Sequence, residues 1–307
     1  MATEASPVGP PLGPPGEPLG GPEPWPAPAK LNLFLHVVGR RPDGYHLLQT
    51  AFQFIDLADE LRFWRRPPGT VERIGEVPGV ASEDDLALRA ARLLAGQCPG
   101  AGGVAIEVRK RIPVQGGLGG GSSDAATVLV ALNELWGGGL GSEALATLGL
   151  GLGADVPVFV GGRAAWAEGV GEALTPLDLP EPVYLLVRPD AAVSTAAVFG
   201  APELTRDTPV ITIRGFLTTG GRNDCEAVVR RRFPAVDEAL DWVGRFAPAR
   251  LTGTGSCVFA AMPDESSARA ALAELPGHWT GYVVRGLNRS PLEARRQLEQ
   301  DLRAGRR

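Results

Sequence analysis

Residues 116–126 read GGLGGGSSDAA, and five of the first six residues are glycine. Glycine loses more backbone freedom on folding than other residues, so glycines this dense indicate backbone shapes that other residues avoid. The preceding segment 104–114, VAIEVRKRIPV, has the pattern of a strand ended by Pro113, and residues 123–136 have helical spacing. A strand, a glycine turn and a helix together present free N–H groups at the positive end of a helix dipole, a site that suits phosphate.

Two familiar phosphate-loop patterns do not fit this stretch. The GxxxxGK[ST] pattern fails because GK occurs nowhere in the chain, and a GxGxxG pattern started at Gly117 puts Ser122 at the third glycine. Ser122 and Ser123 could cap the helix or turn their hydroxyls toward phosphate or a bound Mg²⁺. A flexible turn or a tight helix–strand contact stays the alternative to phosphate binding.

The overall composition is that of a globular chain long enough for two domains. Its 307 residues are 44% hydrophobic and 21% charged, and the formal net charge of -5 argues against nucleic-acid binding by bulk electrostatics. The three cysteines are widely spaced, which predicts no disulfide framework and fits a reducing compartment. No apolar run approaches the ~20 residues of a membrane span. We therefore expect a cytoplasmic protein that binds neither nucleic acid nor membrane.

Strand and helix patterns are mixed without strict alternation, which predicts an α+β fold with two lobes. The predicted strands lie at 31–38, within 45–64, and at 104–114, 182–189, 250–262 and 282–287; the predicted helices lie at 84–96, 123–136 and 266–276. The predicted parts are a disordered Pro/Gly-rich extension at 1–28, an N-terminal lobe at 29–165, a C-terminal lobe at 166–292 and an exposed, fraying, charged helical tail at 293–307.

Two residue types are notable for their rarity or their surroundings. Lys30 and Lys110 are the only lysines among 30 Lys and Arg residues, and a lysine offers a compact charge that an arginine does not. For Lys110, chance is an equally good explanation. Asp155 lies between glycines and the apolar VPVFV, with no further charge before Arg163, which indicates either a helix cap or a functional carboxylate.

Taken together, these segments resemble the GHMP kinase superfamily. Three blocks carry the match: PAKLNLFLHVVGRRPDGYH at 28–46, KRIPVQGGLGGGSSDAATVLVALNELW at 110–136, and RLTGTGSCVFA at 250–260. LGADVPVFV at 152–160 and NDCE at 223–226 also fit, so the similarity runs from about Pro28 to Leu292. GYH and GADVPVF together resemble the branch that acts on a cytidine-diphosphate-linked methylerythritol. Gln115 and Gly116 depart from the usual small or apolar residues before the loop glycines.

The resemblance implies a two-lobed kinase that binds Mg-ATP in a cleft and phosphorylates the 2-hydroxyl of that substrate, in non-mevalonate isoprenoid synthesis. It implies that the ATP phosphates are wrapped by Pro113, Val114, Gln115, Gly116, Gly117, Leu118, Gly119, Gly120, Gly121, Ser122 and Ser123. Asp155 falls where the family places its catalytic base, and Lys30 where it places the supporting lysine. The residues implied to hold the cytidine end are Asn32, Tyr45, His46, Thr195 and Phe199. Tyr45 and Phe199 could clamp the base between them.

Other readings stay open. Another small-molecule kinase of the superfamily, acting on homoserine, a sugar or a mevalonate intermediate, would keep the phosphate loop but would not need GYH. A nucleotide-binding protein without chemistry would not need Asp155 and Lys30. We expect no metal ion held by protein ligands alone, and a monomer or weak homodimer.

Overall fold

The structure, a computed structural model, describes residues 16–77 and 79–305. The strands are β1 (Trp25–Arg40), β2 (His46–Arg66), β3 (Val71–Ile74), β4 (Gly103–Arg109), β5 (Ala165–Glu168), β6 (Ala173–Pro176), β7 (Val183–Arg188), β8 (Arg250–Leu251), β9 (Val258–Met262) and β10 (Thr280–Leu287). The helices are α1 (Leu86–Ala95), α2 (Gly120–Trp136), α3 (Ser142–Leu150), α4 (Val156–Gly161), α5 (Thr195–Phe199), α6 (Ile213–Thr219), α7 (Glu226–Arg232), α8 (Pro234–Gly244), α9 (Glu265–Ala273) and α10 (Pro291–Ala304).

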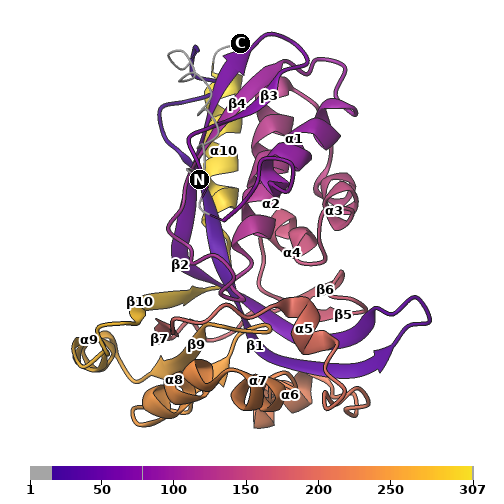
Figure 1. Cartoon of the computed structure of the whole chain (residues 1–307). Coiled ribbons are helices and arrows are strands. Elements are labelled where there is room, and N and C mark those ends of the chain that lie inside the picture. The colour runs from indigo at the N-terminus through magenta and orange to yellow at the C-terminus, as the bar shows by residue number, and fades with distance from the viewer. Residues whose placement is uncertain (1–15, 78, 306–307) are drawn as a thin grey trace, which may run out of the picture.

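Two long antiparallel strands, β1 and β2, form the spine of the molecule and run through both of its halves (Figure 1). β2 also pairs with β4, β5 and β10, and the sheet continues in the order β3-β4-β2-β10-β7-β9-β8. Helices α1 to α4 and α10 surround one half of the spine, and α5 to α9 surround the other (Figure 1). The sheet therefore joins two helical layers without a break between them.

The described residues form four buried hydrophobic clusters, and three of them show how the halves are built and joined. The first fills the space between β1, β2, β4 and helices α1, α2 and α4, with Phe54 and Leu129 among its members. The second lies under α7 and α8 against β7 and β9. A third, smaller core brings Leu31 of β1, Leu118 of the glycine loop and Leu186 of β7 together. Because this core draws on both halves, the expected division at residues 165 and 166 stays a prediction.

The ends of several elements differ from the expectation. α2 begins at Gly120, so the serines at 122 and 123 lie inside its first turn and make no capping hydrogen bond. β4 ends at Arg109, four residues before Pro113, because the buried carboxylate of Asp59 accepts the N–H groups of Arg111 and Ile112 and turns the chain. The predicted strand 250–262 is two strands, β8 and β9, with a turn between them.

The expected disordered extension is wrong for residues 16–28. Trp25 begins β1, opposite Leu61 of β2, and its side chain is 2% exposed. Further out, the N–H of Leu19 donates to the carbonyl of Phe63 at 2.8 Å. A count of prolines and glycines missed this because strand pairing and one buried tryptophan outweigh the composition. Residues 1–15 lie outside the described part.

The prediction that the C-terminal tail is exposed is also wrong for one face of its helix. α10 runs from Pro291 to Ala304, and Leu292, Arg295 and Glu299 are buried. The guanidinium of Arg295 lies 4.3 Å from the ring centroid of Trp25, so the helix packs on the N-terminal segment described above. Residues 306 and 307 lie outside the described part. Within it, no helix is both long enough and apolar enough to cross a membrane.

Candidate active site

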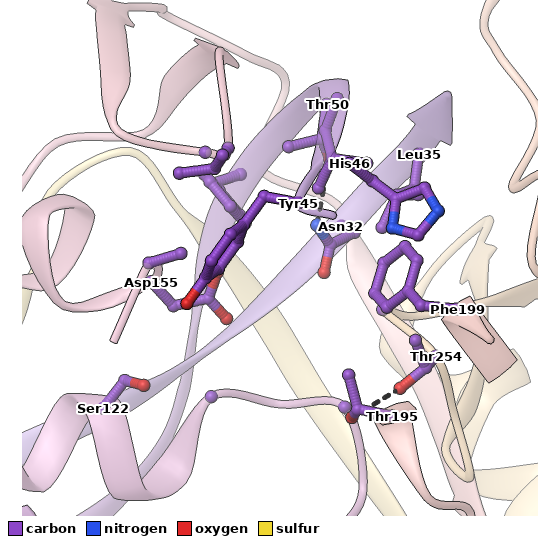
Figure 2. Close-up of a pocket in the computed structure, with 18 of the residues that line it drawn as sticks. Asn32, Leu35, Tyr45, His46, Thr50, Ser122, Asp155, Thr195, Phe199 and Thr254 are labelled. Carbon is purple, nitrogen blue, oxygen red and sulfur yellow. Dashed lines mark hydrogen bonds between the residues drawn. The ribbon is translucent and has the colours of Figure 1, made fainter. Parts of the chain in front are cut away.

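Two adjoining cavities share the glycine loop, and the larger one lies where the halves of the molecule meet. The larger, about 750 Å³, is lined by β1, the start of β2, α5 and the turn after β8 (Figure 2). The smaller, about 350 Å³, is lined by the glycine loop and by Val77, Val80, Asp84, Asp85 and Leu86. Gly117, Gly119 and Ser122 line both cavities. A ligand in one cavity can therefore reach a ligand in the other across the glycine loop.

The loop between β4 and α2 depends on glycine at two positions. Gly117 has a φ of +73°, and a Cβ there would lie 2.3 Å from the carbonyl oxygen of Thr252. Gly119 has a φ of +72°, and its Cβ would lie 2.8 Å from the ring of Phe159. Both angles are in the left-handed region that side chains disfavour. The loop is thus held close to its neighbours, with the N-terminus of the 17-residue helix α2 behind it.

Most of the predicted phosphate-loop residues line the smaller cavity, namely Pro113, Val114, Gln115, Gly116, Gly117, Leu118, Gly119, Gly120, Gly121 and Ser122. Ser123 does not: it is fully buried, and its hydroxyl donates to the carbonyl of Pro28 at 2.6 Å. The structure therefore joins Ser123 to β1 rather than to a ligand. Because successive helix residues point in different directions, only one serine of the pair can face the cavity.

The predicted catalytic pair is brought together. The ammonium of Lys30 on β1 lies 3.3 Å from a carboxylate oxygen of Asp155, at the start of α4. Lys30 is nearly buried, with a side chain 4% exposed, whereas the Asp155 side chain is 33% exposed into the larger cavity. Asp155 makes no capping hydrogen bond to α4, which removes the helix-cap explanation for this residue. The carboxylate is free to meet a ligand.

Asn32 lies beside this pair, and its amide is used within the protein. Its oxygen accepts from the Lys30 ammonium, and its nitrogen donates to the Thr50 hydroxyl at 3.0 Å. Lys30 also donates to the carbonyl of Gly117 at 3.1 Å, which connects the pair to the glycine loop. The structure thus ties Asn32, expected at the cytidine end, to the position of Lys30.

The far end of the larger cavity is aromatic. His46 stacks on Phe199, with ring centroids 5.0 Å apart and planes at 25° (Figure 2). The expected clamp of Tyr45 and Phe199 is not formed in this structure, because His46 faces Phe199 and Tyr45 is 63% exposed. Burial lowers the pKa of His46, and the nearby cations Arg206 and Arg40 lower it further. The imidazole is therefore neutral at pH 7.

Two hydroxyls face each other across the cleft. Thr195, predicted from the resemblance, lies 3.0 Å from Thr254, which the sequence reasoning missed (Figure 2). Thr254 lies within the block at 250–260 that carries part of the family resemblance, but nothing in the sequence singles it out from its neighbours. Thr50 and Arg206 were also missed; both take their places through contacts with residues far away in sequence.

Lys110 forms ion pairs with two aspartates. Its ammonium lies 2.5 Å from Asp59 and 2.7 Å from Asp124, under the glycine loop. Burial lowers the pKa of Lys110, but the two carboxylates outweigh this and raise it. Burial also raises the pKa of Asp124, against the opposing charge of Lys110. The cluster connects β2, the end of β4 and α2, so it supports the loop from below.

Comparison with known proteins assigns the family. Residues 85–163 match the model of the GHMP kinases N terminal domain, and residues 212–281 match GHMP kinases C terminal. A 4-diphosphocytidyl-2-C-methyl-D-erythritol kinase from Halorhodospira halophila is 61% identical over 274 residues, which cover 87% of this chain and 94% of the relative. The chain belongs to this kinase family. A member from Nitrosococcus oceani is 60% identical over 268 residues, covering 87% of this chain and 96% of its own.

Solved structures agree with the family assignment. A crystal structure of 4-(cytidine 5'-diphospho)-2C-methyl-D-erythritol kinase has a TM-score of 0.73 and 37% identity, covering 85% of this chain and 98% of that chain. A mevalonate kinase has a TM-score of 0.64 at 17% identity, which shows a shared fold. The predicted α+β fold of the GHMP kinase type is confirmed.

Proposed function

We propose that this chain transfers the γ-phosphoryl group of ATP to the 2-hydroxyl of 4-diphosphocytidyl-2-C-methyl-D-erythritol. The observation that carries the proposal is the Lys30–Asp155 pair, placed beside the glycine loop that both cavities share. The smaller cavity accommodates ATP and the larger one the cytidine-linked substrate. The substrate is the one named for relatives about 60% identical over most of the chain.

Each member of the pair has a distinct task. Asp155 accepts the proton of the attacking hydroxyl, because an alcohol is a poor nucleophile and a nearby carboxylate lowers the barrier to its attack. Lys30 places a positive charge 3.3 Å from that carboxylate and polarises the hydroxyl. The carbonyl of Gly117 and the amide oxygen of Asn32 hold the ammonium in place. Little reorganisation is then needed during the reaction.

The loop fits a triphosphate, and Mg²⁺ fits as a companion of the phosphates. The loop glycines and the N-terminus of α2 line the cavity, and the N–H groups that a helix N-terminus leaves unpaired favour negative charge there. Among the described residues, no group of three or more His, Cys, Asp or Glu side chains is arranged to hold a metal ion. Magnesium commonly binds through phosphates and one or two protein oxygens. Ser122 and Asp124, which line this cavity, would face it; when bound it spreads the charge of the transferring group.

The substitution Asp155→Asn tests the assignment. We expect the variant to fold and to bind ATP normally, while the turnover number falls by about 10²–10⁴-fold, the usual contribution of a general base. Asp178→Asn is the matched control, since that side chain is 83% exposed and outside the cleft. Turnover within a few-fold of the parent would remove Asp155 from the base position.

A further inference from the structure

Arg206, in the segment that follows α5, lies behind the aromatic end of the larger cavity. Its Nε donates to Nε2 of His46 at 3.1 Å. Its two terminal nitrogens donate to three carbonyl groups, those of Leu204 at 3.0 Å, Phe199 at 2.9 Å and Ala201 at 2.7 Å. One guanidinium thus fastens the imidazole at the start of β2 to the end of the helix that carries Phe199.

The contact decides which imidazole nitrogen carries the proton. An arginine has only N–H donors and stays charged, so its partner nitrogen must offer a lone pair. Nε2 of His46 is that partner, and the hydrogen of the neutral ring is then on Nδ1. Among the described residues, Nδ1 of His46 has no hydrogen-bond acceptor, although the ring lines the larger cavity. The protein therefore presents a free N–H donor there.

The same contact fixes the ring in space. His46 is held at its Nε2 edge by Arg206 and on its face by Phe199, whose ring lies 25° from parallel (Figure 2). Arg206 also holds the carbonyl of Phe199 itself. The imidazole and the phenyl ring are consequently positioned as one unit, with no freedom for the imidazole to flip without losing the arginine.

We propose that Arg206 is a positioning residue for base recognition: it holds His46 as the tautomer protonated at Nδ1, so that the cleft offers one N–H donor to an accepting atom of the base. This rests on the proposed function, in which the larger cavity takes a cytidine-linked substrate. Cytosine has an accepting ring nitrogen at N3, where uracil has an N–H. The arrangement therefore selects cytosine over uracil at this point.

The first experiment reads the tautomer directly. The chain has three histidines, so ¹⁵N-histidine labelling gives a spectrum simple enough to assign with His46→Phe. In the parent protein we expect His46 to show protonated Nδ1 and unprotonated Nε2. In Arg206→Met we expect the ring to populate both tautomers, because the constraint on Nε2 is gone. An unchanged His46 signature in that variant would overturn the proposal.

Steady-state kinetics then test whether the tautomer of His46 affects binding of the cytidine-linked substrate. In Arg206→Met we expect the KM for the cytidine-linked substrate to rise about tenfold, the equivalent of one good hydrogen bond. The turnover number and the KM for ATP should stay within about twofold, and the preference for the cytidine over the uridine form of the substrate should narrow. Equal increases in both KM values would indicate general damage to the cleft and would refute the proposal.

Two further single variants and one double variant sharpen the test, and Arg206→Lys takes the place of Arg206→Met if the latter folds poorly. Arg232→Met is the control for removing an arginine that holds the same segment, because Arg232 pairs with Glu203 at 2.7 Å and is away from His46. Arg206→Lys keeps a charge but not the guanidinium geometry, and should show the same tautomer mixture and KM increase. When Arg206→Met is added to His46→Phe, the KM for the cytidine-linked substrate should not rise further. A tenfold rise in the double variant would refute the claim that Arg206 acts through His46.

Failure of the proposed function would be recognised separately. If the parent protein did not phosphorylate the cytidine-linked substrate, the proposed function would fall. The ¹⁵N spectrum of the free protein needs no substrate and would still decide whether Arg206 fixes the tautomer.

Discussion

Lys30 occupies a nearly closed space and has three acceptors, the carboxylate of Asp155, the amide of Asn32 and the carbonyl of Gly117. A compact ammonium can serve all three at once, whereas a planar guanidinium is longer and needs its partners in one plane. This explains why a chain that uses arginine almost everywhere keeps a lysine at this point.

Lys30→Arg is therefore expected to lose activity although the charge is kept. We predict a fall in turnover of about 100-fold, because the longer side chain displaces Asp155 from the reacting hydroxyl. Steady-state kinetics at saturating ATP would measure it. Arg250→Lys serves as a control, since Arg250 bonds a backbone carbonyl of β1. A fully active Lys30→Arg would mean that charge alone suffices.

His46 should make substrate binding sensitive to acid. Its pKa is lowered by burial and by the cations Arg206 and Arg40, so the ring is neutral above its usual value of 6.5 and is protonated only below it. A protonated ring cannot accept from Arg206, and the KM for the cytidine-linked substrate should rise as the pH falls below 6.5. In Arg206→Met there is no arginine contact to lose, and the protonated ring still carries a hydrogen on Nδ1, so this rise in KM should be absent. A profile of KM between pH 5 and 8 that is identical in both proteins would contradict this.

At the scale of single residues, the sequence identifies candidate functional residues better than it predicts which residues contact one another. Lys30 and Asp155 could be singled out because their surroundings lack similar residues, and the structure brings them together. Ser123 could not be separated from Ser122, because that requires the exact start of α2. Arg206 carried no signal, since its partner His46 lies 160 residues earlier in the chain.

At the scale of elements, local sequence patterns predict a helix well but do not report the pairing that makes a long strand. Helix α1 was predicted closely because apolar spacing and the capping Asp85 are local signals. β2 was expected as several strand-like pieces and is one strand of 21 residues. Its continuity comes from pairing with β1, β4, β5 and β10, which no local pattern reports.

Gly117→Ala tests the shape of the loop. The new methyl group would lie 2.3 Å from the backbone oxygen of Thr252, so the loop must move and the KM for ATP should rise by about tenfold or more. Gly139→Ala is the matched control: its φ of +68° is similar, but nothing lies within 4 Å. That variant should lose roughly 1 kcal/mol of stability and keep its KM for ATP. Equal KM values in the two variants would show that the close approach is unimportant.

Trp25→Ala tests how much the contact between the N-terminal segment and α10 stabilises the fold. Trp25 is 2% exposed and lies under Arg295 of α10, so its removal leaves a large cavity and an unpacked buried cation. We predict a loss of about 3–5 kcal/mol in the free energy of unfolding, measured by urea denaturation. Leu302→Ala, on the exposed side of α10, should change it by less than about 0.5 kcal/mol. A small change in the free energy of unfolding for Trp25→Ala would mean that the N-terminal segment contributes little to stability.

At the scale of the whole molecule, the site exists because two halves share one sheet and one small core. Leu118 of the glycine loop and Leu186 of β7 meet in that core, so the loop is held by both halves. The α+β class follows from the sequence pattern, and the family resemblance implies the cleft. The meeting of two cavities at Gly117, Gly119 and Ser122 depends on packing between distant segments and could only come from the structure.

The most direct test of this account is ADP release by the purified protein with Mg-ATP. It compares 4-diphosphocytidyl-2-C-methyl-D-erythritol with the same methylerythritol compound lacking its cytidine. We predict ADP release with the cytidine-linked compound and little with the other, because only the first fills the aromatic end of the larger cavity. Equal turnover of both would contradict the assignment of that end to the base, and turnover of neither would contradict the proposed reaction.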